Sequence, residues 1–71
     1  MSPLEAPRSL ADDTYTAWAR AQHRCGEALR AWCAAAGPSA RALAFIAYTI
    51  ELDREEQAAA ELERLFARLA A

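Results

Sequence analysis

"CAAAGPSARAL", residues 33–43, contains the one strong interruption in a chain that otherwise favours helix. Glycine at position 37 suits a left-handed residue just past a helix end, and proline at position 38 cannot continue the helix before it. Pro38 can instead occupy the first position of a following helix, or Ser39 can cap that helix. Because the connection is so short, we expect the two flanking helices to fold back on each other as an antiparallel hairpin.

The composition supports an all-α fold on both sides of this turn. Twenty of the 71 residues are Ala, the best helix former, whereas only two are Gly and three are Pro. All eight basic residues are Arg, which is typical of a GC-rich bacterial genome. A chain of this length makes one small domain at most, and its own core stabilises it only marginally.

The chain is expected to consist of a flexible arm and one helical domain. A possible capping box, Ser9-x-x-Asp12, opens the first helix. The predicted segments are an N-terminal arm at 1–8 and a hairpin domain at 9–71, with helices at about 10–36 and 39–69 joined by a turn at 37–38. The polar residues around 50–53 allow a bend or break in the second helix, although the absence of Gly and Pro there favours one continuous helix.

Each predicted helix carries an apolar seam with four-three spacing, as in a coiled coil. The first seam contains Ala11, Tyr15, Trp18, Gln22, Cys25, Leu29, Trp32 and Ala36. The second contains Phe45, Tyr48, Leu52, Glu55, Ala59, Leu62, Phe66 and Leu69, with Leu43, Ile46 and Ile50 as a further stripe beside it. With a turn at 37–38, residue i lies level with about residue 75 − i, so Arg20 and Arg24 should meet Glu55 and Glu51.

The only His, both Cys and one of the two Trp fall within residues 23–33, which raises the possibility of a metal or thiol site. Cys25 and Cys33 are separated by about 12 Å of axial rise, too far for one zinc ion or one disulfide. His23 and Cys25 point to different faces, so a Cys–His nucleophile is not favoured either. We therefore interpret Cys25 as a small packing residue and predict no catalytic, cofactor-binding or metal-binding residue.

The two helices offer more apolar surface than one shared seam can cover. Large exposed apolar patches mark association sites, so we expect a homodimer that closes into a four-helix bundle. The corresponding function is a small non-enzymatic module that self-associates and docks an unidentified protein partner, as an adaptor, chaperone or inhibitor does. The predicted interface residues are Trp18, Leu29, Trp32, Phe45, Tyr48, Leu62, Leu65, Phe66 and Leu69.

Two other functions fit the sequence less well. One is an antitoxin-like regulatory dimer near nucleic acid, with phosphate contacts from Arg20, Arg24, Arg30 and Arg41, but the net charge of −2 argues against it. The other is a bundle that holds a metal or cofactor between chains through His23, Cys25 and the acidic residues at 51–56. No signal peptide or membrane span is predicted, and two Cys without a secretion signal indicate reduced thiols in the cytoplasm.

Overall fold

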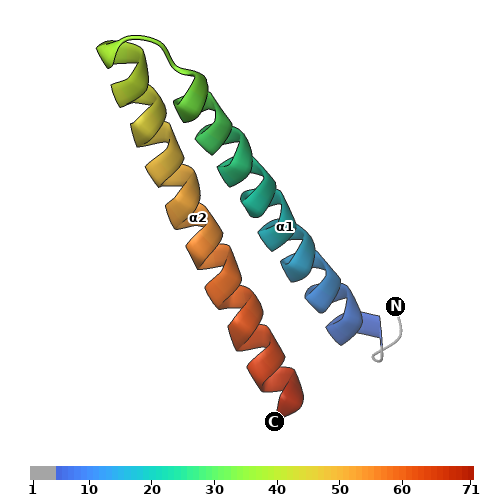
Figure 1. The fold of residues 1–71 in the computed structure, drawn as a ribbon. Coiled ribbons are helices and arrows are strands. Elements are labelled where there is room, and N and C mark those ends of the chain that lie inside the picture. Colours follow the sequence, from blue (N-terminus) through green and yellow to red (C-terminus); the bar gives the residue numbers. More distant parts are fainter. Residues whose placement is uncertain (1–4) are drawn as a thin grey trace.

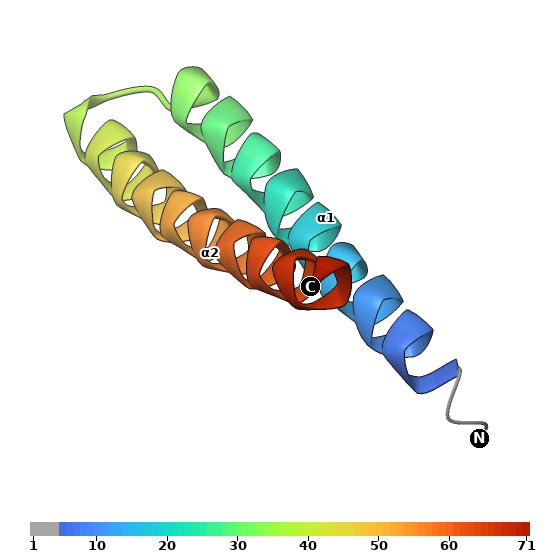
Figure 2. The same ribbon diagram turned by 90° about the horizontal axis from the view of Figure 1, so that it is seen from below.

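The structure, a computed structural model, describes residues 5–71, with side chains described from residue 10 on. It contains two α-helices, α1 (Glu5–Ala34) and α2 (Pro38–Ala70), and no strand in this part of the chain. The helices lie side by side and antiparallel, with the connection at one end and the C-terminus at the other (Figures 1 and 2). The prediction of an all-α helical hairpin is therefore confirmed.

The turn begins earlier than predicted and uses Gly37 differently. Helix α1 ends at Ala34, two residues before the expected end, and Gly37 directly precedes α2. Its φ of 88° and ψ of 154° lie in a region that is essentially restricted to glycine. Pro38 occupies the first turn of α2, and the Arg41 amide donates the first helical hydrogen bond to the Gly37 carbonyl, at 3.0 Å. Ser39 is therefore not the cap, and Gly37 is not the residue that ends α1.

We expect replacement of the two glycines of the chain by Ala to have opposite effects on the stability of the fold. Gly37→Ala should destabilise the fold by about 1–3 kcal/mol, because the positive φ strains a Cβ although no atom lies within 4 Å of it. Gly26→Ala should stabilise the fold by about 0.5–1 kcal/mol, because Gly26 lies inside α1 and its added Cβ would meet only Arg30 Nη1 at 3.5 Å. Urea unfolding followed by circular dichroism measures both. Equal changes for the two variants would contradict this account of the turn.

Helix α1 also starts earlier than the sequence indicated. It begins at Glu5, so residues 5–8, which were assigned to a flexible arm, are helical, and the predicted capping position Ser9 lies within the helix. Pro7 is tolerated because the first four amide groups of a helix have no acceptor inside it. The rest of the predicted arm, residues 1–4, lies outside the described residues.

Helix α2 runs without interruption through the polar stretch where a break was considered. Side-chain contacts along the helix support this stretch: Arg54 Nη1 donates to Glu51 Oε1 at 3.1 Å, and Gln57 Nε2 donates to Asp53 Oδ2 at 3.1 Å. Pairs three and four residues apart lie on neighbouring positions of a helix surface and stabilise it. The possible break near 50–53 is therefore absent, and continuity is confirmed.

Only about half of the residues predicted for the seam lie between the two helices. On α1 the less exposed column runs through Ala11, Thr14, Trp18, Ala21, Cys25, Ala28 and Trp32, and Ala35 continues it just after the helix. On α2 the matching column is Ala44, Tyr48, Glu51, Glu55, Ala58, Leu62 and Leu65. Every second predicted member is therefore replaced by the residue just before it, such as Ala28 in place of Leu29. The inward alanines are small enough to let the helices approach closely, and the larger side chains beside them stay outside.

Candidate functional site: the apolar surfaces of the hairpin

The nine predicted interface residues divide between the seam and the outer surface. Within the seam, Leu65 is buried and four others are half-buried: Trp18, Trp32, Tyr48 and Leu62. The remaining four are exposed: Leu29, Phe45, Phe66 and Leu69. The first group packs mainly between the helices, whereas the second group is exposed to another molecule, although Phe45 also packs against Trp32.

An aromatic cluster fastens the helices near the turn. The ring centroid of Trp32 lies 5.1 Å from that of Phe45 in a tilted arrangement and 5.7 Å from that of Tyr48 in a stacked one. Both geometries are favourable for aromatic pairs. Sequence register alone placed Trp32 level with Leu43, but Leu43 is 70% exposed and lies outside this cluster.

A polar layer occupies the middle of the seam. The Trp18 indole Nε1 donates to Glu55 Oε1 at 3.0 Å, and Arg24 Nε lies 3.5 Å from Glu51 Oε2. The predicted meeting of Arg24 with Glu51 is confirmed, whereas Glu55 bonds to Trp18 rather than to Arg20. Glu51 Oε2 is buried and accepts no hydrogen bond, because the Arg24 contact is an ion pair without hydrogen-bond geometry. Buried polar groups of this kind can fix the register of packed helices at a cost in stability.

The residues that raised the question of a metal or thiol site point in different directions. His23 Nε2 lies 2.8 Å from Glu27 Oε1 on the outer surface of α1. Cys25 is half-buried in the seam, and Cys33 is exposed. Among the described residues, no three His, Cys, Asp or Glu side chains gather as metal ligands would. A metal-holding bundle would therefore need ligands from a second chain.

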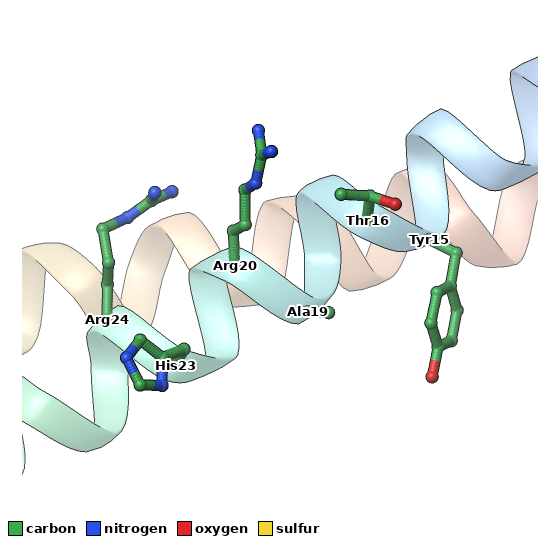
Figure 3. Close-up of a pocket in the computed structure, with 6 residues that line it drawn as sticks. All are labelled: Tyr15, Thr16, Ala19, Arg20, His23 and Arg24. Atoms are coloured by element: carbon green, nitrogen blue, oxygen red, sulfur yellow. The ribbon is translucent and has the colours of Figure 1, made fainter.

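A shallow depression lies along the outside of α1. Its lining comes from this one helix: Tyr15, Thr16, Ala19, Arg20, His23 and Arg24. Figure 3 shows Tyr15 pointing to the opposite side of the helix from Arg20 and Arg24. Since α2 contributes no lining residue, the depression is a surface groove between side chains rather than a cleft that could enclose a substrate.

The two broad sides of the hairpin differ in chemistry. In an antiparallel helix pair, residues that flank the seam at equivalent heptad positions of the two helices lie on the same broad side. We call one side the apolar face; it carries Tyr15, Gln22 and Leu29 from α1 and Ala36 from the connection, with Phe45, Leu52, Ala59 and Phe66 from α2. We call the other the charged face; it carries Leu10, Ala17, Arg24 and Ala31 with Ala47, Arg54, Glu61 and Arg68.

Contacts across the seam support this assignment. Arg24 of α1 and Arg54 of α2 both reach the Glu51 carboxylate, at 3.5 and 3.1 Å, so they share one side. Leu10 likewise lines a groove together with Glu61 and Arg68. The apolar face is the opposite side, and its five large side chains are between 37% and 53% exposed: Tyr15, Leu29, Phe45, Leu52 and Phe66.

A second apolar stripe lies elsewhere on α2. Leu43, Ile46 and Ile50 are spaced by three and four residues, and they are 70%, 54% and 48% exposed. Sequence reasoning recognised this stripe but did not name its residues as an interface, and it also assigned Tyr15 and Leu52 to the seam. Their spacing signalled apolar columns, but spacing does not say which column faces the other helix.

Comparison of the chain with protein-family models, with curated proteins and with solved structures found no match. The two packed helices themselves define the class of the protein, an all-α antiparallel helical hairpin. No helix in the described part of the chain is both long enough and apolar enough to cross a membrane.

Proposed function

We propose that this chain is a small, non-enzymatic protein–protein interaction module that self-associates as a homodimer, forms a four-helix bundle and docks a protein partner. One observation carries the proposal: among the residues with described side chains, only Ala21 and Leu65 are buried, whereas ten large apolar side chains are exposed. Exposed apolar surface of this extent marks an interaction site in a small domain. Such a module acts as an adaptor, a chaperone or an inhibitor.

Two separate surfaces fit two separate occupants. A second copy that covers the apolar face leaves the stripe of Leu43, Ile46 and Ile50 in water, because the stripe lies on another side of α2. We assign that stripe to the protein partner, which would bind by laying an apolar helix or groove against it. The proposed location of the module is the cytoplasm, where its thiols stay reduced.

The charge distribution favours this function over contact with nucleic acid. The four Arg residues considered for phosphate contacts do not all stay free, because Arg24 pairs with Glu51 in the seam. The chain as a whole is acidic, with a net charge of −2, whereas nucleic-acid binding favours a basic surface.

Affinity capture from the native cell tests the docking of a partner. We expect a protein to be retained by the tagged wild type and by Arg20→Gln, but to be lost with Ile46→Glu in the stripe. Arg20 is exposed on α1, and its replacement by Gln changes the net charge by the same amount as Ile46→Glu. Circular dichroism confirms that both variants remain helical. Enrichment of no protein, or equal retention by Ile46→Glu, would contradict the assignment of the stripe to a partner.

A further inference from the structure

The charges of the hairpin are separated along its length. Residues 28–50, around the turn, carry Arg30 and Arg41 and no acidic residue. At the opposite, open end, residues 10–17 and 56–71 carry five acidic residues against two basic ones: Asp12, Asp13, Glu56, Glu61 and Glu63 against Arg64 and Arg68. All nine charged side chains are exposed, and the open end keeps its negative excess when Glu61 and Arg68, which lie on the charged face, are left out. One end of the rod is therefore positive and the other negative.

The apolar face is large enough to support a stable dimer. The Cα atoms extend over 54 Å by 21 Å along the two longer axes of the molecule, and over only 12 Å along the third. A stable interface needs about 800 Å² from each partner, which a broad side of these dimensions can supply. After residue 17, α1 and the connection place no charged residue on this face or in the column of residues directly outside it. The residues there are Ala19, Gln22, Gly26, Leu29, Cys33 and Ala36.

We infer that a second copy of this chain docks on the apolar face with the two turns at opposite ends of the bundle. This inference rests on the proposed self-association and adds its face and orientation. With the turns at opposite ends, the positive turn region of each copy lies against the negative open end of the other. With the turns together, like charges would meet at both ends, and like-charge contacts disfavour association. A two-fold axis near Gln22 and Leu52 relates the copies, so the same residues serve both.

The distance between the two turns tests the orientation. A nitroxide label on Ser39→Cys, with Cys25→Ser and Cys33→Ser to remove the other thiols, places one spin at each turn and off the apolar face. Turns at opposite ends predict a spin–spin distance of about 40 Å, because about 13 residues of helix separate Ser39 from the axis near Leu52 in each copy and each residue adds about 1.5 Å. Turns at the same end predict about 25 Å or less, since packed helices lie 8–10 Å apart. A short distance in a dimer would overturn the orientation but leave self-association intact.

Matched charge substitutions test the face. Leu52→Glu on the apolar face should raise the dimer dissociation constant at least 100-fold, whereas Leu43→Glu in the stripe should leave it within about threefold. Sedimentation measures both constants, and circular dichroism shows whether each variant stays helical. The reverse order of effects would overturn the assigned face while keeping the dimer. A wild-type chain that stays monomeric throughout would overturn both the inference and the proposed self-association.

Discussion

Trp32→Ala should lower the free energy of unfolding by about 3 kcal/mol, the lower end of the range for loss of a large core aromatic, because Trp32 is half-buried. The substitution removes both aromatic contacts of the cluster, since Trp32 packs against Phe45 and Tyr48. In a domain with so small a core, this loss is a large fraction of the total stability. Urea unfolding at fixed protein concentration measures it, because the stability of a self-associating chain depends on concentration.

Trp32→Phe is the matched control for this prediction. It keeps an aromatic ring at the position and should cost clearly less than the alanine variant, since part of the packing with Phe45 and Tyr48 survives. An alanine variant with an unchanged unfolding midpoint would show that the cluster near the turn does not stabilise the hairpin.

Leu65→Ala is expected to destabilise the chain by about 2–4 kcal/mol, because Leu65 is the one large buried side chain among those described from residue 10 on, at 5% exposure. It lies near the open end of the molecule, where Leu10 and Thr14 line a groove with it. Thermal unfolding measured by circular dichroism at fixed concentration should show a lower midpoint.

Leu69→Ala provides the comparison for Leu65. Leu69 lies four residues further along α2 and is 51% exposed, so its truncation should cost less than about 1 kcal/mol. Similar losses at both positions would mean that Leu69 is also covered, as it would be in an interface that includes the end of α2.

The sequence was sufficient to predict the fold because its strongest local signals agree. Gly37 and Pro38 interrupt a chain that is otherwise rich in helix formers, and a short connection leaves antiparallel packing as the simple arrangement. The pairing of Arg24 with Glu51 across the seam could be predicted from the position of the turn and the helical rise per residue alone. The start of α1 could not be predicted as well, because Pro7 can lie either before a helix or within its first turn.

The orientation of the seam could not be read from spacing. Leu29 and Ala28 are neighbours in sequence, and each belongs to a column of residues seven apart beside Cys25 and Trp32. A prediction that follows hydrophobicity chooses Leu29, whereas the structure turns Ala28 inward and leaves Leu29 40% exposed. Glu51 was predicted to meet Arg24 but not to occupy the seam itself. The surplus of apolar surface was correctly anticipated, while its division into an apolar face and a stripe required the structure.

Sedimentation equilibrium of the full chain over a range of concentrations tests the central claim, that a two-helix hairpin with so little buried surface must associate. We predict a mass of twice 7.8 kDa at micromolar concentration, with helicity that falls as the dimer is diluted. A folded monomer of 7.8 kDa at every concentration, with unchanged helicity, would contradict the claim.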